Sequence, residues 1–296
     1  AFIYYFQLTS RQKSRPGSSQ RRVAKLPAQK TEAAGETLKA VRKQLQQIQD
    51  RVSQQALLGR SQEIEANLTR GDLQVVVFGT GSAGKTSLVN ALLGEIVGSV
   101  APTLGTTQEG KTYRLKLKGL QREISIADTP GILEAGIAGT QREQLARQLA
   151  TEADLLLFVV DNDLRQSEYE PLKVLVEIGK RSLLVFNKID RYADADREKI
   201  LRQLRQRLEG LIPAADIITV AANPQPVAIE GGGEIQPEPE ILPLIKRLAA
   251  VLRAEGEDLI ADNILLQSQR LGEEARKIID RQRRRQADKI IEDRKS

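Results

Sequence analysis

The chain has 296 residues, of which 40% are hydrophobic and 3% aromatic, and its formal net charge is +6. This length allows one large domain with additions or two small ones, with enough apolar material for a buried core. Because the sequence contains no Cys and no His, it excludes disulfides, thiol catalysis, imidazole bases and the usual zinc or haem sites. Any chemistry must rest on Asp, Glu, Lys, Ser, Thr and backbone groups.

Residues 1–30 predict a membrane-proximal basic segment. Ala1 to Phe6 is apolar and aromatic, and seven Lys or Arg residues follow before the first acid, Glu32. This pattern is typical of the end of a transmembrane helix and its positive flank, although the apolar piece is far shorter than the ~20 residues a span needs. A disordered basic tail is the alternative. Because the chain has no Met, even at its first position, we expect a fragment or a processed form.

A single amphipathic helix is predicted over residues 31–70. Its apolar residues recur at steps of three and four, at Leu38, Val41, Leu45, Ile48 and Val52. Ile64 and Leu68 extend the pattern, and Gly71 and Asp72 end it. The narrow apolar seam favours a helix packed on the side of the next domain, with a coiled-coil partner helix as the alternative.

Residues 74–87 contain a glycine-rich loop between a buried strand and a helix. The loop reads Gly79-Thr80-Gly81-Ser82-Ala83-Gly84-Lys85-Thr86, followed by Ser87, and it fits the pattern G-x-x-x-x-G-K-[ST] at every position. Glycines let successive N–H groups and the helix N-terminus face phosphates. We expect Lys85 to reach the β- and γ-phosphate oxygens and Thr86 to bind Mg²⁺. The alternative is a chance glycine-rich turn.

Beyond this loop, strands and helices alternate, which predicts an α/β fold with a doubly wound, mostly parallel sheet. The predicted strands cover residues 112–117, 123–127, 154–160, 182–186 and 216–220. The predicted helices cover residues 140–152, 167–178, 195–209 and 241–254. Residues 98–110 are predicted as a loop, and residues 223–239 as a polar excursion rich in Pro and Gly.

Two further motifs lie at the carboxyl ends of predicted strands, where open α/β sheets bind ligands. They are Asp128-Thr129-Pro130-Gly131 and Asn187-Lys188-Ile189-Asp190. With the glycine-rich loop, their order and spacing resemble the P-loop GTPases. The resemblance implies that Asp128 holds Mg²⁺ through water and that the Gly131 N–H senses the γ-phosphate. It also implies that Asp190 reads guanine, while Asn187 and Lys188 brace the loop and cover the base.

The finer resemblance, over roughly residues 72 to 253, is to the Era, TrmE and EngA branch of these GTPases. Leu104-Gly105-Thr106-Thr107 is similar to switch I of that branch, which implies that Thr107, with Thr106 as the alternative, reaches Mg²⁺ and the γ-phosphate. Ala221 and Ala222 lie where the branch has its guanine-contacting loop, although Ala221 replaces the usual Ser. Ser82 replaces the Asn of potassium-activated relatives, so potassium dependence is not carried over.

The residue after Gly131 bears on the rate of hydrolysis. Ras-like proteins place a water-orienting Gln there, whereas this chain has Ile132, which forms no hydrogen bond through its side chain. We therefore expect slow intrinsic turnover, at about 10⁻⁴ to 10⁻² s⁻¹. Glu134 is the nearest acid that could replace the Gln, and a second copy or an activating partner is the alternative.

The order of segments is similar to that of membrane-associated bacterial and cyanobacterial GTPases with a C-terminal region of unknown function. It comprises the basic segment 1–30, the helix 31–70, a G domain over 71–254, and a charged helix over 255–296 leading into a missing region. The basic run Arg281 to Arg285 could contact anionic lipid or nucleic acid, but a solvated helix end is favoured. With 3% aromatics, nucleic-acid binding is not favoured.

We therefore expect a Mg²⁺-dependent GTP-binding protein that hydrolyses GTP to GDP as a molecular switch at the cytoplasmic face of a membrane. Its expected partners are guanine nucleotide, a membrane contacted through residues outside this chain, and a homodimer or activating partner. The alternative is a dynamin-like GTPase that assembles on membranes and remodels them. Liposome-stimulated hydrolysis with self-assembly distinguishes the two hypotheses.

Overall fold

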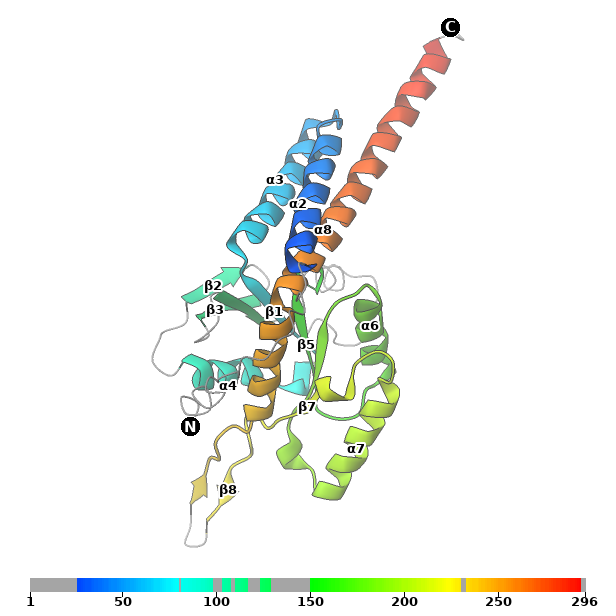
Figure 1. Ribbon diagram of the computed structural model, residues 1–296. Coiled ribbons are helices and arrows are strands. Elements are labelled where there is room, and N and C mark those ends of the chain that lie inside the picture. The colour runs from blue at the N-terminus through cyan, green and yellow to red at the C-terminus, as the bar shows by residue number, and fades with distance from the viewer. Residues whose placement is uncertain are drawn as a thin grey trace, which may run out of the picture.

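The computed structural model describes residues 26–79, 81–97, 103–107, 110–116, 123–128, 150–229 and 233–293. These residues form a seven-stranded sheet with helices on both faces and a three-helix bundle that projects from one edge of the sheet (Figure 1). Of the predicted basic segment 1–30, residues 1–25 lie outside the described residues, and residues 26–30 form the start of the first helix instead of a linker. Among the described helices, none is both long and apolar enough to cross a membrane.

The sheet confirms the predicted doubly wound, mostly parallel α/β fold. Its strands lie in the order β2-β3-β4-β1-β5-β6-β7, with β2 and β3, and β3 and β4, antiparallel and every other neighbouring pair parallel. The bounds are β1 Leu73–Gly79, β2 Thr103–Thr107, β3 Gly110–Lys116, β4 Glu123–Asp128, β5 Leu155–Val160, β6 Ser182–Phe186 and β7 Ile217–Thr219. Since β1, β4, β5, β6 and β7 run parallel, their carboxyl ends meet at one edge.

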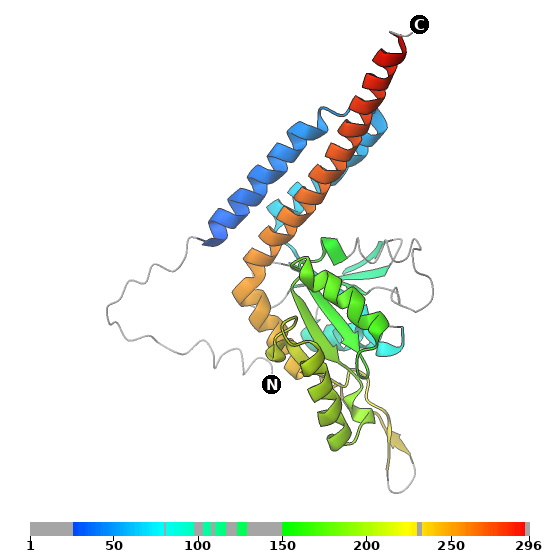
Figure 2. The same cartoon turned by 90° about the vertical axis from the view of Figure 1, so that its right-hand side faces the viewer.

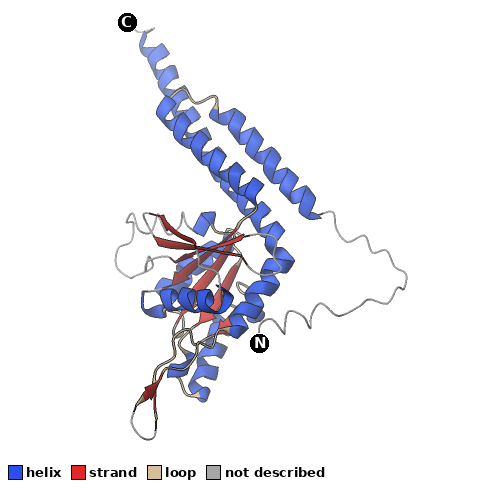
Figure 3. Ribbon diagram, turned by 90° about the vertical axis from the view of Figure 1, so that its left-hand side faces the viewer, coloured by secondary structure: helices blue, strands red, loops and turns tan. Residues whose placement is uncertain are grey.

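Helices cover both faces of this sheet, so the central strands are apolar on both sides. Val75 and Val77 of β1 pack toward α4 and the first part of α8, whereas Val76 and Phe78 pack toward α6 and α7. Figure 2 shows α6 and α7 in front of the sheet, and Figure 3 shows the strands as a central layer between helices. The bounds are α4 Lys85–Val97, α6 Gln166–Glu177, α7 Asp194–Arg207 and α8 Leu242–Asp293.

The prediction of a single helix over 31–70 is wrong. The chain forms two helices, α2 (Leu26–Leu45) and α3 (Arg51–Arg70), which pack with α8 as the bundle. Asp50 starts α3 because its Oδ2 accepts a hydrogen bond from the Ser53 N–H at 3.0 Å. The turn leaves Val52 77% exposed, although its spacing had assigned it to the apolar seam.

The predicted boundary near residue 254 is also absent, because α8 is one helix of 52 residues. Its Gly256 and Gly272 are close-packing positions. A Cβ at Gly256 would lie 3.4 Å from Leu73 Cδ1, and one at Gly272 would lie 3.3 Å from Val41 Cγ2. Glycine therefore lets α8 approach β1 and α2 closely without ending the helix.

Two stretches predicted as irregular contain strands. Within 98–110, β2 is an edge strand that pairs antiparallel with β3. Within the 223–239 excursion, β8 (Val227–Ala228) and β9 (Glu234–Ile235) form a separate hairpin. These short strands were not predicted because residues typical of turns dominate both stretches of the sequence.

A buried polar network fastens α8 to the start of β5. Lys180 Nζ donates to the carbonyls of Thr151 at 2.6 Å and Ala153 at 2.8 Å, and to Asn263 Oδ1 at 2.6 Å. Asn263 Nδ2 in turn donates to Asp154 Oδ1 at 2.7 Å. Burial raises the pKa of Asp154 to about 6 and lowers the pKa of Lys180 to about 7.

The raised pKa predicts how an Asp154→Asn variant differs from the parent. The Asp154 pKa is higher in the folded state, about 6, than in the unfolded state, 3.8. The free energy of unfolding therefore falls as pH rises from 3.8 through about 6. The amide mimics the protonated acid and does not titrate. Over this window, the parent should therefore lose about 3 kcal/mol of unfolding free energy relative to Asp154→Asn.

Urea unfolding of both proteins at a series of pH values measures this difference. If the difference is constant from pH 4 to pH 7, the hydrogen bonds from the Gln74 N–H and Asn263 offset the burial of the carboxylate.

Candidate functional site

The glycine-rich loop lies at the carboxyl edge of the sheet, between β1 and α4. Gly79 has φ 146° and Gly84 has φ 89°, both in the region that favours glycine. A Cβ at Gly79 would lie 2.2 Å from the Val159 carbonyl oxygen, and one at Gly84 would lie 2.5 Å from Asn187 Nδ2. Only glycine fits at these two positions, so the backbone itself shapes the loop. Between them, η1 covers Gly81–Ala83.

Lys85 and Thr86 open α4 beside the end of β4. Lys85 is 5% exposed, and its Nζ donates to the Gly79 carbonyl at 3.0 Å. Thr86 Oγ1 donates to Asp128 Oδ2 at 2.7 Å. Asp128 Oδ1 is buried and has no hydrogen-bond partner among the described residues. Hence the hydroxyl and the carboxylate predicted to serve one metal ion are adjacent, with one carboxylate oxygen still able to accept.

Asn187 joins three loops. Its side chain is 1% exposed at the end of β6. Nδ2 donates to the Ala83 carbonyl at 2.9 Å, and Oδ1 accepts from the Ala222 N–H at 3.0 Å. Ala221 and Ala222 are 2% and 3% exposed. One amide therefore connects the glycine-rich loop with the two loops predicted to bind the base.

Lys188 adopts a left-handed backbone conformation, with φ 62°. Its Nζ donates to Asp161 Oδ2 at 2.7 Å and also to the Ser82 carbonyl. Tyr192 Oη donates to the Asp161 carbonyl at 2.6 Å. Such a backbone conformation is typical of functional loops in which the surroundings hold a residue in place. Asp161 was missed from the sequence; the available signal was an acid directly after a buried strand at the same edge.

Asp190 follows Lys188 by two residues and contacts a different neighbouring loop. It lies in η2 (Ile189–Arg191), and its Oδ2 accepts from the Gln225 N–H at 3.1 Å. The neighbouring loop is fixed by a backbone pair, in which Ala221 and Glu240 exchange N–H···O bonds of 3.0 and 2.8 Å. The predicted guanine reader is therefore held next to the segment that leaves β7.

Most of the remaining predicted site residues have side chains outside the described part of the structure, and Ser87 is the exception. Thr107 is the last residue of β2 and pairs with Gly110 of β3, and its side chain lies outside the described set. Thr80, Gly131, Ile132 and Glu134 lie outside the described residues altogether. Ser87 follows Thr86 in the first turn of α4 and is half-buried.

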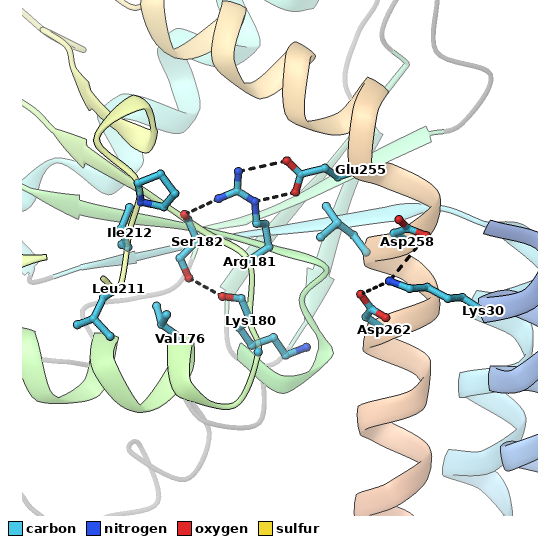
Figure 4. Close-up of a pocket in the computed structure, with 13 residues that line it drawn as sticks. Lys30, Val176, Lys180, Arg181, Ser182, Leu211, Ile212, Glu255, Asp258 and Asp262 are labelled. Carbon is cyan, nitrogen blue, oxygen red and sulfur yellow. Dashed lines mark hydrogen bonds and ion pairs between the residues drawn. The ribbon is translucent and has the colours of Figure 1, made fainter. Parts of the chain in front are cut away.

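A pocket of about 480 Å³ lies at the opposite edge of the sheet, between α8, the start of β6 and α2 (Figure 4). Arg181 and Lys30 at its wall pair with acids of α8. Arg181 binds Glu255 at 2.8 Å, and Lys30 lies 3.2 Å from Asp262 and 3.9 Å from Asp258. These contacts fasten α8 to the sheet, and the pocket contains none of the predicted nucleotide-binding residues.

Comparison with known proteins agrees with this geometry. Residues 74–188 match the family described as 50S ribosome-binding GTPase. Within residues 74–188, the chain therefore matches a P-loop GTPase domain. GTPase Der of Nautilia profundicola is 33% identical over 120 residues, which are 40% of this chain and 26% of Der. The tRNA modification GTPase MnmE of Nitratidesulfovibrio vulgaris is 40% identical over 118 residues, which are 39% of this chain and 25% of MnmE.

The similar regions support the predicted Era, TrmE and EngA branch of P-loop GTPases. The crystal structure of Aquifex aeolicus Era bound to GDP and AlF4⁻ has a TM-score of 0.44 and 23% identity, covering 62% of this chain and 56% of Era. The chain covers about a quarter of the length of Der and MnmE. The similarity therefore concerns the GTPase domain, and α2, α3 and all of α8 lie outside the matched family segment.

The contact of Lys188 with Asp161 predicts a positioning role for this acid. Asp161→Ala removes the charged partner of the Lys188 ammonium and leaves only its bond to the Ser82 carbonyl, so guanine nucleotide affinity should fall roughly tenfold, because a hydrogen bond to a charged group is lost. Titration with fluorescent GDP measures the affinity. Asp163→Ala is the matched control, since Asp163 pairs with Arg207 at 3.2 Å and does not contact Lys188. Equal affinities for the two variants would contradict the assignment.

Proposed function

We propose that this chain binds Mg²⁺·GTP at the carboxyl edge of its sheet and hydrolyses it to GDP and phosphate as a molecular switch. The Asn187 amide carries the proposal, because it unites the phosphate loop and both base loops in one buried arrangement. Gly79 to Ser87 would surround the phosphates, and Asp190 would pair with the guanine N–H groups. Turnover should be slow without assistance, since Ile132 replaces the water-orienting Gln.

The residues at the end of β4 fit a magnesium ion. A hydroxyl and a carboxylate are the hard oxygen ligands that Mg²⁺ prefers, and Mg²⁺ keeps several of its waters. Thr86 Oγ1 can bind directly, and the orphaned Asp128 Oδ1 can accept a hydrogen bond from a metal-bound water. Thr107 is the proposed third contributor, from β2. The ion supplies charge to offset the phosphates.

Base selectivity tests the proposal at Asp190. Asp190→Asn replaces an acceptor by an amide that can also donate, so the variant should lose GTP affinity and gain affinity for xanthosine triphosphate, which offers a carbonyl at that position. Titration calorimetry with GTP, ATP and xanthosine triphosphate measures the change. If the parent binds ATP and GTP equally, the proposed guanine site is wrong.

Metal dependence tests Thr86 and Asp128. The parent should bind GTP more tightly in Mg²⁺ than in EDTA, and Thr86→Ala or Asp128→Asn should reduce this ratio toward one, because each removes a ligand or a water acceptor. Asn90→Ala is the matched control, since Asn90 is exposed one turn further along α4. A Thr86→Ala protein that keeps the full Mg²⁺ effect would remove Thr86 from the metal site.

Location at the cytoplasmic face of a membrane also belongs to the proposal, and it is supported by the aromatic and basic pattern of residues 1–30. Among the described residues, the bundle of α2, α3 and α8 supports the dynamin-like alternative. Single-turnover hydrolysis over a wide range of protein concentration, with and without liposomes, separates the two. A rate that rises with both concentration and lipid favours assembly, and a rate that ignores both favours a monomeric switch.

A further inference from the structure

The hairpin that follows the base-binding loop has an exposed apolar face. Val227 of β8 pairs with Ile235 of β9, and the Ile229 N–H bonds the Gly233 carbonyl at 3.0 Å. Since paired residues and residues two apart share a face, Val227, Ile229 and Ile235 lie on one side of the hairpin. They are 58%, 46% and 56% exposed. We call the described residues of this stretch, 223–229 and 233–240, the arm.

No described part of the chain covers this face. The arm projects from the carboxyl edge of the sheet, away from the helix bundle (Figure 1). An isolated two-stranded hairpin is marginally stable in water, and exposed apolar clusters of this kind are typical of binding sites. The exposed apolar face is therefore a candidate binding surface.

The charge of the arm limits the chemistry of that partner. The arm includes three Glu and no Lys or Arg, in a chain whose net charge is +6. Glu234, Glu238 and Glu240 are exposed, and none forms an ion pair within the described residues. A partner that combines apolar side chains with Lys or Arg would match both features. The same arm of a second copy would bring like charges together.

The base of the arm touches the proposed guanine reader. Gln225 N–H donates to Asp190 Oδ2, the group that would pair with guanine, and Glu240 at the other end of the arm pairs with Ala221. Guanine and Gln225 would therefore donate to the same carboxylate, which has acceptor sites for both. The contact links the position of the arm to that of Asp190, so docking that displaces the arm would also displace the acceptor that guanine needs.

We propose that the arm docks a basic, apolar segment of a partner protein and that this docking favours the nucleotide-free state. The coupling rests on the proposed function, whereas the docking surface does not. Because coupling is reciprocal, a partner that binds the nucleotide-free arm more tightly must weaken guanine nucleotide binding by the same factor.

The docking surface is tested on the full chain with short synthetic peptides of alternating Val and Lys, Val and Glu, or Ser and Lys. The Val/Lys peptide should bind the parent, and the double variant Val227→Ser, Ile235→Ser should lose about tenfold or more in affinity. Ala228→Ser, on the opposite face of β8, is the matched control and should bind as the parent does. Unfolding temperatures establish that all variants are folded.

Three results would overturn the docking surface. They are equal binding of the Val/Glu peptide, unchanged binding by the double variant, and a parent dimer in sedimentation that the double variant abolishes. The last result would assign the arm to self-association.

The coupling is tested by repeating the Val/Lys titration with saturating GDP. GDP should weaken peptide binding about fivefold or more, and the peptide should accelerate release of fluorescent GDP. Peptide affinity that ignores bound GDP would overturn the coupling and leave the docking surface standing. If GDP does not bind at all, the proposed function fails, and the peptide titrations without nucleotide still decide the docking surface.

Discussion

The side-chain amide of Asn187 is the interaction on which the nucleotide edge depends. Both of its partners, the Ala83 carbonyl and the Ala222 N–H, are backbone groups of other loops, and the amide is almost fully buried. The backbone of Asn187 is itself fixed, because its N–H bonds the Val160 carbonyl at 2.7 Å. The central strands thus set the geometry of the loops before any ligand binds, which is the preorganisation that tight binding requires.

The opposite edge of the sheet is held by paired charges. Asp216 is fully buried and accepts from Arg181 at 2.8 Å and Arg247 at 2.7 Å, while Arg181 also pairs with Glu255 of α8. A buried carboxylate without partners is costly, so these arginines must stay in place. The ion pairs and the Lys180 network attach α8 to this edge and leave the carboxyl edge to the site.

The sequence predicts the features that depend on local pattern. Strands β1, β5 and β6 are apolar on both faces, and the loop glycines and the motif residues are recognisable one by one. The turn between α2 and α3 was missed because the apolar spacing continues from Leu45 through Ile48 to Val52 and no Gly or Pro interrupts it. The role of Asp161 was missed because it meets Lys188 across neighbouring strands, 27 residues away.

The unbroken α8 shows why a local preference can mislead. An interior glycine costs a helix about 1 kcal/mol relative to alanine, so Gly256 favours a boundary when the sequence is read by itself. In the fold, close packing of Gly256 on Leu73 and of Gly272 on Val41 offsets that cost, and both contacts join segments remote in sequence. Because α8 starts two residues after Glu240, which pairs with Ala221, the base-binding loop and the bundle are connected by one continuous helix.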